Sequence, residues 1–188
     1  MSGNPSSGRS ARYQTSMGAM VGAMIVLVGA VLAFVLFREL FRENVETTPE
    51  AVDWESAVIG AQDSGLSPVH PPALPVGWIA TSVVLTSEER PAWGMGMLTE
   101  DGRFVGLRQE DDSLSRLLET FVDEDAEEGE PVEVGGDLGG TWATYSDEGG
   151  DLALALERDE DVVLVYGSAD QADLVAFASL LTEEPFQR

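Results

Sequence analysis

The chain has 188 residues, with 34 acidic residues against 10 basic ones and a formal net charge of −24. Such acidity excludes nucleic acid and anionic lipid surfaces as ligands of the folded part, because both require a basic patch. There is no cysteine, which excludes disulfides, thiol catalysis and cysteine metal sites. The acidity is consistent with solubility, with adaptation to salt, or with a basic partner.

Residues 1–16 are polar and rich in serine and glycine, and we expect them to form a disordered cytoplasmic tail. Residues 17–37 (MGAMVGAMIVLVGAVLAFVLF) then contain no charged side chain. A helix of this length spans about 30 Å, the thickness of the hydrocarbon core of a bilayer. The apolar run is longer than the ~7–15 residues of a signal peptide, and no Ala-x-Ala cleavage site follows it. We therefore predict a single-pass transmembrane helix.

The arginines that flank the predicted span do not decide its orientation, since two lie on each side of it. A short tail that stays inside, with a long domain exported, is a common arrangement. We expect a plasma-membrane protein with a cytoplasmic N-terminus, a juxtamembrane linker at residues 38–51 and an acidic extracytoplasmic domain at residues 52–188.

Within this domain, the apolar spacing predicts an amphipathic helix at residues 52–62, and the proline-rich residues 67–75 are predicted to be extended. Residues 113–122 are predicted to be a helix that Ser113 caps, and residues 170–181 a final helix. Alternating or β-branched residues predict strands in two groups: 77–87, 93–99 and 103–109, then 131–134, 141–145, 152–156 and 162–166.

Short strands joined by tight turns pair in antiparallel fashion. We therefore expect an α+β fold in which a mainly antiparallel sheet of about six or seven strands is covered by helices on one face. The two runs of strands, each followed by a helix, hint at an internal duplication, but no matching residues support it.

Several segments resemble a known family. They are residues 75–82 (PVGWIATS), the hairpin from Trp93 to Gln109, Val134-Gly-Gly, Trp142, Tyr145, and residues 165–169 with the helix after them. From about Thr15 to Leu181 the chain is similar to actinobacterial single-pass membrane-anchored proteins with a C-terminal domain of unknown function. The resemblance implies an anchor, its orientation and one C-terminal domain. It implies no activity and no catalytic residue.

Candidate catalytic and metal-binding residues are few. His70 is the only histidine, so a histidine triad or a two-histidine metal site is excluded, and we expect it to face solvent in a loop. Asp123, Asp125 and Glu127 could hold a divalent cation weakly, but the glycine and glutamate of an EF-hand are missing, which favours a solvated charge run. The paired glycines at 135–136 and 139–140, and Gly94-x-Gly96, are read as turns and close approaches.

Trp78, Trp93 and Trp142 fall on predicted strands and are more often core residues than a ligand surface. Arg103 and Arg108 are expected to pair with carboxylates. We predict no catalytic residue, metal or cofactor. The first hypothesis is a non-enzymatic accessory or interaction protein of the cell envelope, which is anchored in the bilayer by residues 17–37 and binds another envelope or membrane protein. The alternative is an extracytoplasmic binding module for a small ligand or cation.

Overall fold

The computed structural model describes residues 50–86, 90–159 and 161–186. The predicted tail, the predicted membrane helix at 17–37 and most of the predicted linker lie outside the described residues. In the part of the chain that the structure describes, no helix is long and apolar enough to cross a membrane. The chain divides between Thr48 and Pro49, so every described residue belongs to the second unit.

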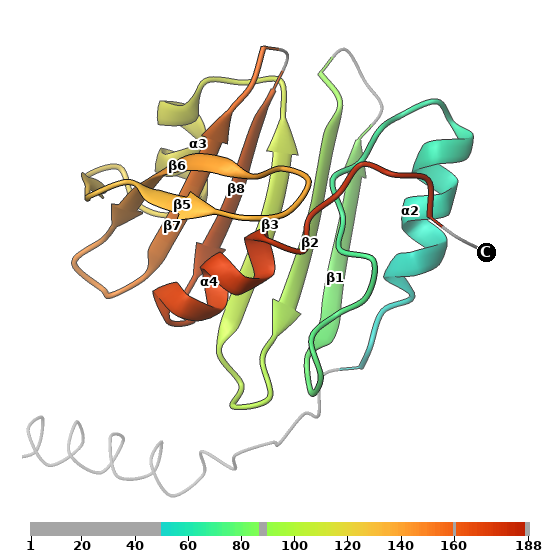
Figure 1. Ribbon diagram of the computed structural model, residues 1–188, viewed down its shortest axis with the longest axis horizontal. Coiled ribbons are helices and arrows are strands. Elements are labelled where there is room, and N and C mark those ends of the chain that lie inside the picture. Colours follow the sequence, from blue (N-terminus) through green and yellow to red (C-terminus); the bar gives the residue numbers. More distant parts are fainter. Residues whose placement is uncertain (1–49, 87–89, 160, 187–188) are drawn as a thin grey trace, which may run out of the picture. The chain divides into compact units, whose positions relative to one another are not determined.

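Three helices and eight strands make up the described residues (Figure 1). In chain order they are α2 (Trp54–Asp63), β1 (Ile79–Thr86), β2 (Ala92–Leu98), β3 (Phe104–Glu110), α3 (Leu114–Phe121), β4 (Glu127–Glu128), β5 (Val132–Val134), β6 (Gly140–Ser146), β7 (Leu152–Glu157), β8 (Val162–Gly167) and α4 (Gln171–Ala178). The predicted α+β class is confirmed.

All strand pairs are antiparallel, in the order β1-β2-β3-β8-β7-β6-β4, with β5 paired to β6 outside this path. The contact between β3 and β8 joins the two halves of the chain, since it pairs Gly106 with Tyr166 and Glu110 with Val162. Strand β4 was not predicted. Its two glutamates lie in the acidic segment, residues 123–130, which was expected to be a solvated charge run in a loop, and they pair with Tyr145 and Ser146 of β6.

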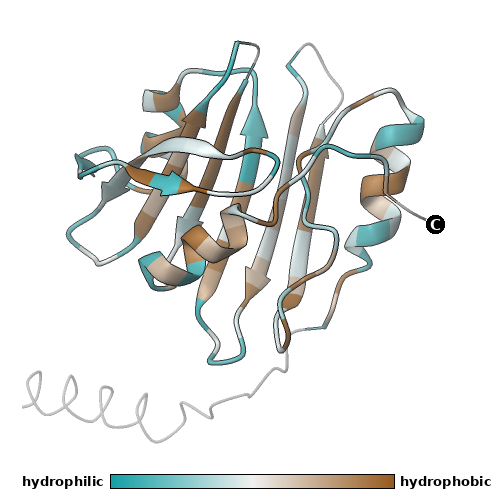
Figure 2. Cartoon of the chain, viewed as in Figure 1, coloured by the Kyte–Doolittle hydropathy of each residue, from teal (hydrophilic) through white to brown (hydrophobic). Residues whose placement is uncertain are grey.

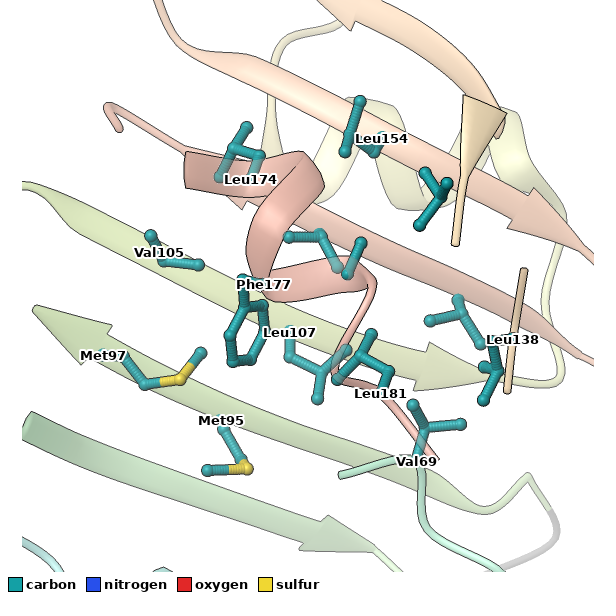
Figure 3. Close-up of a cluster of buried hydrophobic side chains, with 14 of the residues drawn as sticks. Val69, Met95, Met97, Val105, Leu107, Leu138, Leu154, Leu174, Phe177 and Leu181 are labelled. Atoms are coloured by element: carbon teal, nitrogen blue, oxygen red, sulfur yellow. The ribbon is translucent and has the colours of Figure 1, made fainter. Parts of the chain in front are cut away.

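One face of the sheet carries the main hydrophobic core, which Figure 3 shows beneath helix α4. Phe177 points from α4 onto this face and is fully buried. The proline-rich segment crosses the same face and buries Val69, while Trp142 of β6 is buried in the same cluster. Residues far apart in the sequence therefore share one core.

The opposite face of the sheet is covered by α3, so the expectation that the helices cover one face was wrong. Leu117 and Leu118 of α3 pack against a second cluster that includes Ala153, Ala155 and Leu164. Strands β7 and β8 are apolar on both sides, and Figure 2 shows hydrophobic colours along them. A strand that is apolar on both faces is stable only when both faces are covered. Because α3 and α4 lie on opposite faces, the structure does not support the internal duplication that the order of strands and helices hinted at.

The helices differ in the hydrogen bonds made by the backbone groups at their ends. Asp53 caps α2 by accepting hydrogen bonds from the amide and the hydroxyl of Ser56, and these bonds lower the pKa of Asp53. Ser113 precedes α3 as predicted, but its side chain makes no capping bond. Helix α4 ends at Ala178, earlier than predicted, because the amides of Leu180 and Leu181 bond three residues back and tighten the last turn.

Candidate functional site

An open cleft of about 950 Å³ lies at one end of the sheet, where β1, β3 and β7 end and where β2 and β8 begin. This end is uppermost in Figure 1. Its lining residues are of two kinds, and we call the apolar ones the apolar wall and the polar ones the polar wall. The apolar wall contains Leu66, Pro68, Leu85, Pro91, Ala92 and Trp93. The polar wall contains Gln109, Glu110, Asp111, Arg158, Asp159, Asp161 and Glu183.

A chain of hydrogen bonds, called here the polar network, joins four of these side chains: Gln109, Asp161, Arg158 and Glu183. Arg158 donates through Nε and Nη2 to the two oxygens of Asp161, at 2.6 and 2.7 Å, and through Nη1 to Glu183 at 2.9 Å. Gln109 donates to Asp161 at 2.8 Å. The network therefore ties β3, the β7–β8 turn and the segment after α4 together.

Gln109 also fixes the proline-rich segment, whose residues Ser67 and Pro68 line the cleft. Its Oε1 accepts a bond from the amide of Val69 at 2.8 Å, and the indole of Trp93 donates to the carbonyl of Val69 at 2.7 Å. Trp93 is 3% exposed. The backbone of Val69 is thus held from both sides, and the polar network holds this wall of the cleft in place.

The charges within the network stabilise one another. Burial opposes the ionisation of Asp161, but the hydrogen bonds from Arg158 and Gln109 outweigh it and hold the pKa of Asp161 below its ordinary value. The hydrogen bond to Asp161 is also the main reason why the pKa of Arg158 is raised. Both groups are charged at neutral pH, and each compensates the other.

The remaining charges of the cleft are carboxylates without a cation. Asp111 and Asp159 are exposed, line the cleft and are not among the ion pairs of the described residues. Every arginine in this part of the chain already contacts a carboxylate: Arg90, Arg103, Arg108, Arg116 and Arg158. The cleft therefore presents uncompensated negative charge beside an apolar wall.

His70 does not face solvent, and that expectation was wrong. The residue is 2% exposed and forms an isolated β-bridge with Thr182. Its Nδ1 lies 3.0 Å from the carbonyl oxygen of Pro71 and its Nε2 lies 3.0 Å from that of Glu184. The proline-rich segment crosses the core, which the composition of the segment does not reveal. His70 is not among the residues that line the cleft. Its contacts with Thr182 and Glu184 hold the C-terminal segment instead.

The tryptophans and arginines considered in the sequence analysis mostly pack in the core or form ion pairs. Trp93 and Trp142 are core residues, as expected, and Trp78 lies one residue before β1, where it stacks on Phe177 at 5.6 Å. Arg103 pairs with Asp101 and Asp170, and Arg108 pairs with Glu110. The expected carboxylate partners of both arginines are confirmed.

The acidic segment is split between a turn and a strand. Asp123 accepts a bond from the amide of Asp125 in the turn, whereas Glu127 lies in β4. Among the described residues, no group of three or more His, Cys, Asp or Glu is arranged to hold a metal ion. The structure does not bring the acidic segment to the cleft, because none of its residues lines it.

Sequence reasoning did not find the polar network. Its members Gln109, Arg158 and Asp161 come from two hairpins far apart in the chain. One signal was available: Arg158 and Asp161 flank the β7–β8 turn, where an arginine stands among acids. In the structure the backbone amide of Arg158 also donates to the carbonyl of Asp161 across that turn.

Comparisons with known proteins identify a family for this chain but no activity. No curated protein matches the chain, and no solved structure matches it. A family model described as "Protein of unknown function (DUF4245)" matches residues 12–181. This match spans the last five residues of the predicted tail, the predicted membrane segment and nearly the whole folded domain. The chain therefore belongs to the DUF4245 family of proteins of unknown function.

Proposed function

We propose that this protein is a membrane-anchored accessory or interaction protein of the cell envelope, which acts by binding another envelope protein and performs no catalysis. One observation carries the proposal: the polar groups of the cleft bond to one another, and its remaining charges, Asp111 and Asp159, are of one sign. A catalytic site needs a nucleophile or acid held in place beside a base, and among the described residues no hydrogen bond or ion pair of the side chains holds Asp111 or Asp159 beside such a group. An uncompensated acidic wall beside an apolar wall suits recognition instead.

The membrane part of the proposal rests on the uncharged run at residues 17–37 and on the acid-free tail before it. We expect the N-terminus to be cytoplasmic and the folded domain to be extracytoplasmic. Protease added to intact spheroplasts should then digest the folded domain and spare an epitope placed in the tail. A protected domain, in cells whose outer surface proteins are digested, would contradict this orientation.

Site-specific cross-linking of the full chain tests the binding function. A photoreactive benzoylphenylalanine replaces Ser67, which is exposed and lines the cleft, and in a matched variant it replaces Glu119, which is exposed on α3 at the opposite face. We expect one envelope protein to cross-link to the Ser67 position and not to the Glu119 position. Absence of a cross-linked protein from both positions, with both variants present at normal levels in the membrane, would count against the proposal.

Binding of a small organic ligand is a second candidate, which the size of the cleft favours. Small-molecule sites typically enclose about 300–1,000 Å³, and the cleft measures about 950 Å³. Its free carboxylates, Asp111 and Asp159, would select a cationic ligand. A rise in the unfolding temperature of the full chain with added polyamine, and with no envelope protein cross-linked, would favour this candidate.

A further inference from the structure

The charge and the apolar residues of the cleft also indicate what kind of partner segment it binds. This inference rests on the proposed function. We propose that the cleft binds an extended basic segment of the partner protein. The arginine or lysine side chains of that segment meet Asp111 and Asp159 at the polar wall. Its apolar side chains lie on Leu66, Leu85 and Pro91 of the apolar wall.

The charge of the cleft decides in favour of a cationic segment. Arg158 is the one cation among the lining residues that the structure describes, and its three donor nitrogens all bond to Asp161 or Glu183. An acidic or phosphorylated segment would find the charge of Arg158 already paired with Asp161 and Glu183 and would meet the carboxylates of Asp111 and Asp159. A guanidinium or ammonium group of the bound segment would compensate the charge of these two residues.

The apolar wall decides between a peptide and a bare cation. Leu85, at the end of β1, is 42% exposed although it is a large hydrophobic residue. Leu66 is half-buried and Pro91 is exposed on the same wall. An inorganic cation gains nothing from this surface, whereas an extended peptide with alternating side chains can bury it while its charged side chains reach the other wall.

A second copy of this chain is the less suitable occupant. Its net charge of −24 would bring a strongly acidic surface to an acidic cleft. Like charges that face each other across an interface cost free energy and slow association. The described part of the chain also has no arginine without a carboxylate partner that could enter the cleft of another copy.

The test measures binding of a labelled peptide to the full chain in phosphatidylcholine nanodiscs by fluorescence anisotropy, with empty nanodiscs as the blank. The peptide alternates arginine, serine and leucine. Its two matched versions replace arginine by glutamate, or leucine by serine. We expect the basic peptide with leucine to bind, the serine version to bind several-fold more weakly and the acidic version not to bind.

Two double variants locate the binding site. Asp111→Asn with Asp159→Asn should weaken the affinity by about five- to tenfold, because each lost charge pair at an exposed site is worth up to about 1 kcal/mol. The control Glu119→Gln with Glu124→Gln removes the same charge from exposed carboxylates on and after α3, at the opposite face. It should leave the affinity nearly unchanged at physiological ionic strength, where distant charges are screened.

A third variant tests the apolar wall. Leu85→Ser should weaken binding of the leucine-containing peptide and leave its serine version unaffected. Equal losses of affinity in both double variants would overturn the inference, since the general field and not the cleft would then attract the peptide. Spermine that binds as tightly as the peptide, and is insensitive to Leu85→Ser, would also overturn it. A cross-linked envelope protein without peptide binding would reject this inference and leave the proposed function standing.

Discussion

Asp161 shows how one residue can decide the geometry of the cleft. It lies in the β7–β8 turn, and its two oxygens accept two bonds from Arg158 and one from Gln109. Its side chain is 15% exposed, so water cannot readily replace these partners. Removing one member of such a group leaves the others with unpaired charge or unpaired donors, which costs more than the group contributes when intact.

Asp161→Asn should therefore destabilise the domain by about 1–3 kcal/mol at neutral pH. Because the folded-state pKa of Asp161 is lowered, its stabilisation is present above the ordinary aspartate pKa, near 3.9, and is lost as the pH falls through the folded value. The difference between wild type and variant should thus shrink as the pH falls below about 4. Urea unfolding at a series of pH values measures this difference.

The control for this experiment is Asp159→Asn, two residues away and exposed without a partner among the described residues. It should change the free energy of unfolding by less than about 0.5 kcal/mol. A difference between wild type and Asp161→Asn that stays constant across the acid range would contradict the role given to the ionised carboxylate.

Gly106 offers a second prediction at this scale. A Cβ there would collide with the ring of Tyr166. Phe104 and Phe121 hold this ring, with centroids at 5.9 and 5.4 Å, and burial raises the pKa of Tyr166. Gly106→Ala should cost about 1–3 kcal/mol, because the ring would have to leave its contacts with Phe104 and Phe121. Chemical denaturation measures the change.

Gly60 provides the opposite case for comparison. It lies within α2, and a Cβ there would meet nothing within 4 Å. Gly60→Ala should stabilise the domain by about 0.5–1 kcal/mol, because alanine restricts the unfolded chain and favours a helix. Equal effects of the two alanine variants would show that contact with Tyr166 does not decide the outcome.

At the scale of elements, local patterns predicted most of the structure. The hairpin across Glu100-Asp101-Gly102 was expected at 93–99 and 103–109, and β2 and β3 occupy Ala92–Leu98 and Phe104–Glu110. Here alternation and turn chemistry agree. Strand β4 was missed because two glutamates have no strand preference of their own. They are extended because Tyr145 and Ser146 of β6 supply a backbone to pair with.

The candidate site could not be predicted in the same way. Gln109 contacts Val69 and Asp161, which are 40 and 52 positions away in the sequence. The antiparallel contact of β3 with β8 brings them together, and a sequence pattern contains no information about which strands become neighbours. For the same reason the burial of His70 depends on Thr182, its partner after α4, and was not foreseen.

Gln62 is one of several side chains that hold the segment after α4, together with His70 and Arg158. Gln62 of α2 accepts a bond from the amide of Phe186 at 2.9 Å and donates one to the carbonyl of Glu184 at 3.1 Å. The ring of Phe186 packs edge-on against Trp54, with centroids 5.5 Å apart. Without Gln62, the segment would keep the ring contacts of Phe186 and its contacts with His70, and residues 184–186 would lose two hydrogen bonds.

Gln62→Leu should therefore loosen residues 184–186 while the sheet stays folded. We expect amide hydrogen exchange in this segment to become at least about tenfold faster, the loss that follows from about 1.4 kcal/mol of local stability. Gln171→Leu, at the exposed start of α4, is the matched control and should not change exchange there. Uniformly faster exchange across the sheet in the Gln62 variant would show a global effect instead.

Considered as a whole, the domain has a hydrophobic core on each face of one sheet. Helix α4 and the proline-rich segment cover one face, and α3 covers the other. All the strands are linked through hydrogen-bonded neighbours. A core of this kind is sufficient for independent folding of a domain of this size.

A fragment of residues 50–188 should consequently fold by itself. We expect a monomer whose circular dichroism shows mixed helix and strand, and a single cooperative transition that chelator and reductant leave unchanged. The full chain in nanodiscs serves as the reference. A fragment that is unfolded, or that unfolds with chelator, would contradict a self-sufficient core.

The net charge of −24 leads to the last prediction. Exposed carboxylates repel one another in the folded domain, and salt screens this repulsion, so stability should rise between low and physiological ionic strength. Neutralising the acidic segment by Asp123→Asn, Asp125→Asn, Glu127→Gln and Glu128→Gln should raise stability at low salt and flatten this dependence. It should also lower the pKa of Tyr145, which burial first and then Glu128 and Glu157 raise.

The same variant separates the two explanations of the acidity. The acidic segment does not line the cleft, so a partner that binds at the cleft should still cross-link to the Ser67 position. The variant should then merely precipitate more readily at low salt, because less net charge keeps the molecules apart. If the cross-linked partner is lost while Asp111 and Asp159 remain, the acidic segment and not the cleft is the binding surface, and the charge serves recognition there.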